Sequence, residues 1–358
     1  MLKPRESIRC LSAYHAPAAG RSGLNLDLNE NTGGCSPRVL QRLKSLTTLD
    51  IARYPEREQG ERLVADFLGL SPEQVLLTNG VDEALHLLAE TYLGEGDEAI
   101  LIAPTFTMYP IYIQATGARI VEIPCAEDFA YPTDRVLQAI NSRTRLIAIA
   151  NPNNPTGTTV PRTDLLRVLQ AAPDAAVIVD EAYFEFFGQT LLDQLPDFDH
   201  LFITRTLSKA YGLAGLRLGA LLGAATQVDL IRRFVPPFNV NGVALACLGE
   251  ALADQEFVHS YVEQVREGRA RLQQLCDDLG LHYWPSQANF VLVRVGPRSQ
   301  QLSAALERRG ILVRDRSSEP GCTGCVRITI GLRQHTEQLL AAMRLALADI
   351  GVTNRVSA

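Results

Sequence analysis

The run Thr206–Arg217 places one amine among hydroxyl groups, glycines and a cation. It reads Thr-Leu-Ser-Lys-Ala-Tyr-Gly-Leu-Ala-Gly-Leu-Arg, with Lys209 in fourth place. An amine can form an imine with an aldehyde, while hydroxyl groups and an arginine can hold an anion. Pyridoxal 5′-phosphate is an aldehyde that carries a phosphate, and proteins usually bind it through a lysine imine and an acidic partner for its ring nitrogen. Taken alone, the run is equally consistent with a strand-to-helix turn whose lysine is solvated.

A carboxylate stands at the end of an apolar run elsewhere in the chain. Asp180 follows Ala-Val-Ile-Val, and a carboxylate at the end of a buried strand is costly unless it is paired. A protonated pyridine nitrogen would pair it; a helix cap is the alternative role. Glu181 suggests an acid/base pair of carboxylates, but adjacent strand residues face opposite sides and would not share one substrate. Tyr183 follows and could reach a ring hydroxyl after the strand bends.

Two further turns follow predicted strands. In Thr78-Asn79-Gly80-Val81-Asp82-Glu83 the glycine permits a tight turn, and the N–H groups after it open a helix, which makes an anion site. The alternative is a plain helix start at which two acidic side chains favour the dipole. The second turn, Asn-Pro-Asn-Asn-Pro-Thr-Gly (151–157), is rigid and extended and projects amide side chains.

Short apolar runs alternate with amphipathic segments between about residues 60 and 235. This alternation predicts an α/β fold, with a mostly parallel sheet covered on both faces and ligands bound beyond the carboxyl ends of its strands. The predicted strands are 75–77, 99–102, 119–121, 146–150, 176–179 and 201–204. The predicted helices between them include 81–93, 133–140 and 162–171.

The C-terminal third has a different pattern, typical of a smaller α+β domain. It contains predicted helices at 257–279 and 337–347 and predicted strands at 289–293 and 326–330. We therefore expect a large domain over residues 46–240, and a second body built from 1–45 and 241–358. The stretch before about Asn31 has few periodic cues and is expected to pack across the cleft between them.

Composition excludes several other classes of protein. The 358 residues are 46% hydrophobic and 21% charged with a formal charge of −6, an ordinary globular profile without the basic block of a nucleic-acid binder. No apolar run could span a bilayer, and no signal peptide is evident. Seven scattered cysteines favour reduced thiols and a cytoplasmic location. Cys322 and Cys325 have C-x-x-C spacing, but no second pair matches them, so no metal site is expected.

The ordered motifs 151–157, Val-Asp-Glu-Ala-Tyr (179–183) and Thr206–Gly219 resemble those of the fold-type-I pyridoxal-phosphate aminotransferases. Within that class they are most similar to the histidinol-phosphate aminotransferases. Leu-Asn-Glu-Asn (28–31), Arg-Tyr-Pro (53–55), Val-Arg-Asp (313–315) and Val-Arg-Ile-Thr (326–329) extend the similarity over nearly the whole chain. The resemblance implies a three-layer αβα large domain with a mixed, mostly parallel sheet, a smaller α+β domain, and pyridoxal 5′-phosphate as cofactor.

The resemblance also implies roles at matching positions. Lys209 would form the imine and move the substrate proton, Asp180 would keep the ring nitrogen protonated, and Tyr183 with Asn154 would hydrogen-bond the ring hydroxyl. Tyr109 would stack on the ring. The residues implied to hold the phosphate are Thr206, Ser208, Arg217, the backbone of Val81 and Asp82, and Tyr54 from the partner of an obligatory homodimer. The residues implied to bind substrate are Tyr14, Asn31, Arg314 and Arg327.

The activity implied is amino-group transfer between L-histidinol phosphate and 2-oxoglutarate, giving imidazole-acetol phosphate and L-glutamate, in histidine biosynthesis. An aromatic amino-acid aminotransferase and a threonine-phosphate decarboxylase are the alternatives within the same fold. A cofactor-sensing regulator would need a DNA-binding segment, and a nucleotide-dependent oxidoreductase a glycine-rich fingerprint; the sequence has neither. One departure affects the substrate cleft: Thr32 follows Asn31 where the family usually has proline.

Overall fold

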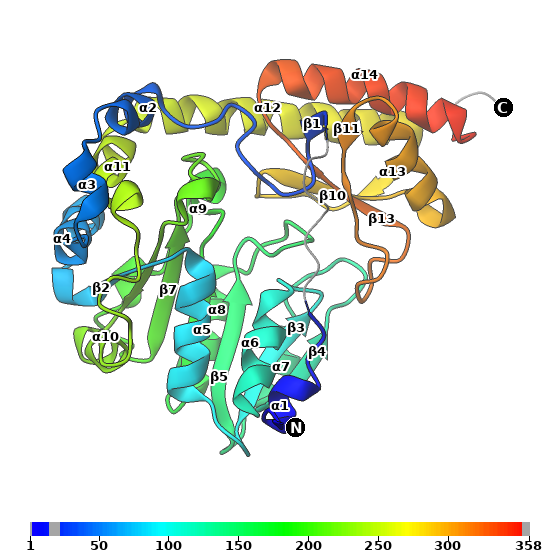
Figure 1. Ribbon diagram of the computed structural model, residues 1–358. Coiled ribbons are helices and arrows are strands. Elements are labelled where there is room, and N and C mark those ends of the chain that lie inside the picture. The colour runs from blue at the N-terminus through cyan, green and yellow to red at the C-terminus, as the bar shows by residue number, and fades with distance from the viewer. Residues whose placement is uncertain (1, 14–21, 353–358) are drawn as a thin grey trace.

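Three sheets organise the computed structural model, which describes residues 2–13 and 22–352 (Figure 1). The largest has the strand order β2-β8-β7-β6-β5-β3-β4, and only β8 runs antiparallel to its neighbours. The predicted mixed, mostly parallel sheet is therefore confirmed, although β8 itself was not predicted. Its strands are β2 (Val75–Thr78), β3 (Glu98–Ala103), β4 (Arg119–Pro124), β5 (Thr144–Ala150), β6 (Ala176–Asp180), β7 (Leu201–Thr206) and β8 (Gly219–Gly223).

Helices cover both faces of this sheet because its strands are apolar on both sides. Along β5, Leu146 and Ala148 belong to one buried cluster, while Ile147 and Ile149 belong to the other. Helices α5 (Val81–Tyr92), α6 (Met108–Thr116) and α10 (Ala225–Arg232) pack on the first face. The second face is covered by α4 (Arg57–Leu68), α7 (Thr133–Ala139), α8 (Arg162–Ala171), α9 (Phe184–Phe187) and α11 (Gly242–Ala253).

The second body contains an antiparallel sheet of order β12-β13-β10-β9. These strands are β9 (His282–Tyr283), β10 (Phe290–Arg294), β12 (Arg314–Asp315) and β13 (Cys325–Thr329). Its helices are α12 (Gln255–Leu279), α13 (Ser299–Glu307) and α14 (Arg333–Asp349). In Figure 1 α12 runs along the top from the α2/α11 region to this body, where α14 lies beside it. The division into 46–240 and 1–45 plus 241–358 remains our proposal for the domain boundary.

The remaining elements are short. They are α1 (Glu6–Arg9), α2 (Pro37–Lys44), α3 (Thr48–Ala52), β1 (Leu24–Asn25), which pairs with β11 (Ile311–Leu312), and the 3₁₀ turns η1 (Pro72–Gln74), η2 (Leu192–Gln194), η3 (Ala214–Leu216) and η4 (Gly296–Arg298). Within the described ranges, no helix combines the length and apolar character that crossing a bilayer requires.

Residues 26–31, here called the N-terminal strap, join the two bodies, as the sequence led us to expect. The backbone of Leu26 bonds to Leu312 and Thr329 of the small body, at 2.8 and 2.9 Å. At the other end, the Asn31 amide donates to the carbonyl of Ala210 in the large body, at 2.9 Å. The strap thus crosses the cleft and carries main-chain acceptors into it.

Thr32, the departure from the usual proline, fixes the strap to the start of α14. Its Oγ1 accepts a hydrogen bond from the N–H of Leu332 at 2.9 Å. A Cβ added at Gly331 would lie 2.0 Å from that hydroxyl oxygen, so the adjacent glycine makes room for it. Thr32 does not line the cavity described below. Its hydroxyl therefore supports the fold and does not contact a ligand in that cavity.

We predict that Thr32→Val lowers the free energy of unfolding by about 1 kcal/mol, because it leaves the Leu332 N–H without its acceptor while keeping the side-chain shape. Urea unfolding followed by circular dichroism measures this loss. Thr32→Ser is the matched control, since it keeps the hydroxyl and should stay close to the wild type. Equal stability of the valine and serine variants would contradict the assignment.

Candidate active site

One cavity lies at the carboxyl ends of β5, β6 and β7, beside the start of α5. Its lining residues come from the strap, both sheets and the loops after these strands: Asp27, Leu28, Asn29, Glu30, Val81, Asp82, Phe106, Thr107, Ala150, Pro152, Asn154, Asp180, Ala182, Tyr183, Thr206, Ser208, Lys209, Ala214, Arg217, Arg314, Arg316 and Arg327. Parallel strands bring their carboxyl ends to one edge, which explains why motifs far apart in sequence meet here.

Lys209 projects into this cavity from the loop that follows β7. Its Nζ donates to the carbonyl oxygen of Leu28 in the strap, at 3.2 Å. Burial lowers the pKa of Lys209 to about 8, and the nearby charge of Arg327 adds to the effect. An amine with such a pKa is partly neutral near physiological pH and can attack an aldehyde.

Asp180 is a buried carboxylate whose two oxygens are both held by donors. Oδ1 accepts from Thr204 Oγ1 at 2.8 Å and from the Ala182 N–H at 3.2 Å, and Oδ2 accepts from the Tyr109 hydroxyl at 2.8 Å. Burial raises the pKa of Asp180, while these three hydrogen bonds act in the opposite direction. Glu181 faces the other way and pairs with Arg205 at 2.7 Å. Opposite orientation of the two carboxylates, expected from strand geometry, is therefore confirmed.

An anion site is formed where β8 approaches the start of α5. Gly80 adopts a φ of 78°, and the helix begins at the next residue, so the N–H groups of Val81 and Asp82 end at the cavity. A Cβ at Gly219 would lie 2.7 Å from Val81 N, which shows how closely the two segments pack. Arg217, with a φ of 55°, reaches the same place and pairs with Asp82 at 3.0 Å.

Thr206 and Ser208 complete this anion site from the other side. Both line the cavity, and the Thr206 hydroxyl accepts from the Ser208 N–H at 3.1 Å, which fixes the turn after β7. Hydroxyl groups, helix N–H groups and a guanidinium together form a donor set suited to a phosphate. The residues present therefore fit the phosphate of pyridoxal 5′-phosphate, with Lys209 in the same cavity.

Asn154 and Tyr183 lie on the wall facing the small body. Asn154 Oδ1 accepts from Arg327 at 2.6 Å, and the Tyr183 hydroxyl oxygen accepts from the Asn29 amide at 3.0 Å. Both side chains line the cavity. Their polar groups are in a position to hydrogen-bond a ligand held between Lys209 and Asp180.

Arg327 is a buried cation whose hydrogen bonds, among the described residues, go to neutral groups. It donates to Asn154 and to the Asp27 carbonyl oxygen, at 2.6 Å each, and its Nε has no hydrogen-bond partner in the described structure. No carboxylate of the described residues forms an ion pair with it, and burial lowers its pKa to about 10. The nearby carboxylate of Glu319 is paired with Arg316, and a buried cation that forms no ion pair of its own among the described residues is costly, so this site favours an anionic ligand.

Two further arginines stand on the same side of the cavity. Arg314 is half-buried, and Arg316, two residues along, is buried and paired with Glu319. Both also line a second, adjoining cavity together with residues 10, 12 and 13 near the N-terminus. The sequence analysis missed Arg316; the repeat of arginine at alternate positions in Val-Arg-Asp-Arg was the available signal, because alternate residues of an extended segment share a face.

Two residues predicted to contact ligands are not in the cavity lining. Tyr109 does not line the cavity; it lies behind Asp180, and Phe106 faces the cavity and meets the Tyr109 ring edge-on at 5.6 Å between centroids. Helix α6 begins only at Met108, so Tyr109 sits in its first turn and points into the core. Asn31 also lies outside the cavity lining. Its side-chain Nδ2 donates to the carbonyl oxygen of Ala210, and its side-chain Oδ1 accepts from the Gly33 N–H.

The structure describes one of two further predicted residues. Tyr54 is 77% exposed and stacks on Phe238, with ring centroids 4.2 Å apart, on an outer face and away from its own chain's cavity. Tyr14 falls outside the described residues.

Cys322 and Cys325 are buried free thiols packed with Trp284. Among residues 2–13 and 22–352, no group of three or more His, Cys, Asp or Glu side chains is arranged to hold a metal ion.

Comparison with known proteins agrees with this geometry. The sequence profile of the family described as aminotransferase class I and II matches residues 21–343. The chain is 36% identical to histidinol-phosphate aminotransferase 2 of Hydrogenovibrio crunogenus, over 90% of this chain and 87% of the relative. It is 37% identical to the histidinol-phosphate aminotransferase of a Geobacillus species, over 91% and 90%.

Solved structures share the fold. Histidinol-phosphate aminotransferase from Sinorhizobium meliloti, in complex with pyridoxal-5′-phosphate, superposes with a TM-score of 0.89 at 24% identity, over 98% of this chain and 99% of that one. L-Threonine-O-3-phosphate decarboxylase from Porphyromonas gingivalis superposes with a TM-score of 0.77 at 22% identity, over 91% and 99%. The fold alone therefore does not separate these two reactions.

We predict that the amine of Lys209 reacts with a small arylating reagent at a rate that is half-maximal near pH 8, well below the ordinary lysine value of 10.5. Below that pH the amine is protonated and unreactive, and above it the amine is neutral. Peptide mass mapping of modified protein across pH 6–11 measures the profile. Replacing the nearby cation, in Arg327→Leu, should move the midpoint upward; a wild-type midpoint above pH 10 would contradict the assignment.

Proposed function

The chain belongs to the class I and II aminotransferase family, and from this we propose that it transfers an amino group between L-histidinol phosphate and 2-oxoglutarate with pyridoxal 5′-phosphate as cofactor. The products are imidazole-acetol phosphate and L-glutamate, a step of histidine biosynthesis. One observation carries the proposal: a lysine amine, a buried carboxylate and a phosphate-type anion site line the same cavity.

Each part of the reaction would fall to a particular side chain. When bound, the cofactor supplies an electron sink for the bond broken at the substrate α-carbon. Lys209 would hold the cofactor aldehyde through its amine, and the same amine would move a proton at the substrate α-carbon. Asp180, held by three donors, would accept a hydrogen bond from the ring N–H and stabilise its positive charge. Asn154 and Tyr183 would orient the ring through its hydroxyl group.

The arginines support the choice of substrates. Arg327 has no carboxylate partner among the described residues, and Arg314 stands beside it at the cavity. Their planar guanidinium groups can bind a carboxylate or a phosphate bidentately, so one site can accept both the phosphorylated amine and the dicarboxylate in turn. An aromatic amino-acid aminotransferase would use the same cofactor machinery but would prefer donors without a phosphate.

We predict that holoenzyme mixed with one equivalent of L-histidinol phosphate converts its visible absorption band to that of the aminated cofactor much more completely than with L-phenylalanine. Stopped-flow absorbance in a single turnover measures this preference. Lys209→Ala is the control, since it should lose both the visible band of the lysine adduct and turnover. Equal or faster conversion by phenylalanine would instead support the aromatic aminotransferase.

We also propose that the active form is a homodimer with shared sites. Large apolar side chains are exposed on α3, on α4, on the turn between them and on the loop before α11: Leu49, Ile51, Tyr54, Leu63, Phe67, Phe234 and Phe238. Exposed apolar area of this kind favours association. Tyr54 lies at this face, from which it would reach the cofactor phosphate of the partner.

We place the enzyme in the cytoplasm, a proposal supported by its seven free cysteines.

We predict that two inactive variants restore each other. In an equal mixture of refolded Tyr54→Ala and Lys209→Ala subunits, half the dimers are mixed and each contains one complete site, so activity should reach about a quarter of the wild-type rate. Steady-state assay of the mixture measures it. A mixture of Asp180→Ala and Lys209→Ala is the control, because both residues serve their own chain's site and no complete site can form. Equal activity of the two mixtures would contradict sharing through Tyr54.

A further inference from the structure

The start of α5 combines an anion site with two acidic side chains. Asp82 and Glu83 occupy its first turn, beside the N–H groups of Val81 and Asp82 that face the cavity. A carboxylate near these N–H groups competes with a phosphate for them and repels it. Arg217 pairs with Asp82, so that charge is balanced within the site. The Glu83 carboxylate needs a separate set of contacts to keep its charge away from the anion site.

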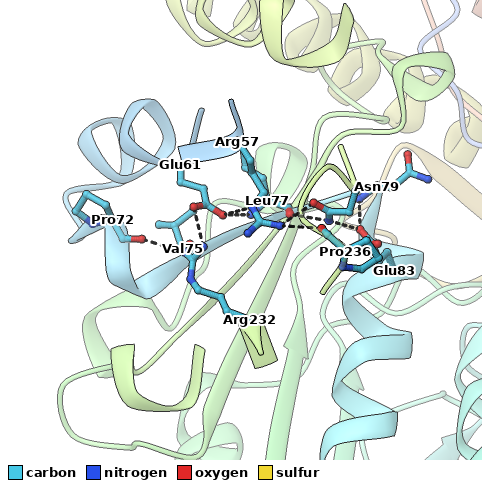
Figure 2. Close-up of polar contacts among 10 residues, drawn as sticks. Arg57, Glu61, Pro72, Val75, Leu77, Asn79, Glu83, Arg232 and Pro236 are labelled. Carbon is cyan, nitrogen blue, oxygen red and sulfur yellow. Dashed lines mark hydrogen bonds and ion pairs between the residues drawn. The ribbon is translucent and has the colours of Figure 1, made fainter. Parts of the chain in front are cut away.

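Glu83 is turned away from the cavity by two hydrogen bonds. Its Oε2 accepts from the Asn79 N–H at 2.6 Å and from the side-chain amide of Asn239 at 2.6 Å. Figure 2 shows Glu83 beside Asn79 at the start of α5. Glu83 does not line the cavity, whereas its neighbour Asp82 does.

Asn239 lies in the segment between α10 and α11, and its amide can adopt only one orientation. Arg57, which has donors only, donates to its Oδ1 at 2.8 Å, so the Nδ2 group must face Glu83 and the Leu77 carbonyl oxygen, 3.2 Å away. A flipped amide would place two acceptors against each other at Glu83. Asn239 is therefore fixed as a donor to the carboxylate.

A buried charge cluster holds Arg57 in place. Glu61 is 2% exposed and pairs with Arg57 at 3.1 Å and with Arg232 at 2.8 Å, and it accepts from the Leu77 N–H at 3.1 Å. Removing one member of such a cluster leaves a buried charge uncompensated, so its geometry is strongly maintained. Asn239 links Arg57 to Glu83, and Figure 2 shows Glu61, Arg57 and Glu83 along this row of contacts.

We propose that Asn239 is a positioning residue of the cofactor-phosphate site: it holds the Glu83 carboxylate on the Asn79 N–H, keeps that charge away from the N–H groups at the start of α5, and thereby sets the affinity for the phosphate. The inference rests on the proposed function for the identity of the anion as the phosphate of pyridoxal 5′-phosphate. It does not require Asn239 to touch the cofactor.

The test compares two aldehydes that differ only in the phosphate. Asn239→Ala should weaken binding of pyridoxal 5′-phosphate to the apoenzyme by about tenfold, since a carboxylate near a helix start contributes on the order of 1 kcal/mol or more. Binding of pyridoxal should change less than about twofold. Absorbance titration of the lysine adduct measures both dissociation constants. Arg233→Ala is the matched control, because this exposed residue of the same segment pairs only with Asp229.

A second substitution distinguishes charge control from simple packing. Glu83→Gln keeps an acceptor for Asn79 but removes the charge, so it should bind pyridoxal 5′-phosphate at least as tightly as the wild type. In the double variant Asn239→Ala/Glu83→Gln the affinity should return to within about threefold of the wild-type value. Thermal unfolding of each apoenzyme establishes that the single variants are folded before titration.

Three results would overturn the inference while leaving the proposed function in place: wild-type affinity in Asn239→Ala, an equal loss for both aldehydes, or no recovery in the double variant. Wild-type apoenzyme that bound no pyridoxal 5′-phosphate would instead overturn the proposed function, and this inference with it.

Discussion

A carboxylate buried at the end of a central strand constrains the whole site. Asp180 ends β6, whose neighbours on both sides are parallel, and three donors from β7, α6 and its own loop hold its oxygens. Burial favours the neutral acid, and these donors favour the charged form. The carboxylate remains useful as an ion-pair partner only while these donors are in place. Tyr109 and Thr204 therefore matter to the chemistry without contacting a substrate.

The charges around the cavity follow one rule. Acidic groups near the anion site are each occupied, Asp82 by Arg217 and Glu83 by two N–H donors, whereas Arg327 is held by neutral acceptors. Arg327 thus leaves positive charge available toward the cavity, while the two carboxylates in the first turn of α5 are engaged by other groups. This imbalance suits a site that has to receive a phosphate from the cofactor and anionic groups from both substrates.

Much of this arrangement could be predicted from sequence because it is set by local strand ends. Asp180 ends an apolar strand, Lys209 and Asn154 lie three and four residues after the end of one, and all three line the cavity at the predicted edge. The position of Tyr109 could not be read from sequence, because the residue at which α6 begins decides whether position 106 or 109 faces the cavity, and the structure has Phe106 in the lining. Strand β8, Gly-Ala-Leu-Leu-Gly, is bounded by glycines and gave no strand signal. Asn239 and Arg57 were not predicted, since their roles depend on contacts 182 residues apart.

The N-terminal strap has a consequence for how the molecule is made. Its Asp27 carbonyl accepts from Arg327 and its Leu26 carbonyl from the Thr329 N–H, partners that follow about 300 residues later in the chain. Synthesis proceeds from the N-terminus, so the strap leaves the ribosome first but cannot take its place until β13 has emerged. The large sheet, by contrast, is complete once β8 is made. The cavity can therefore be completed only after the large sheet, and a chain interrupted before residue 329 has the strands of that sheet but no finished site.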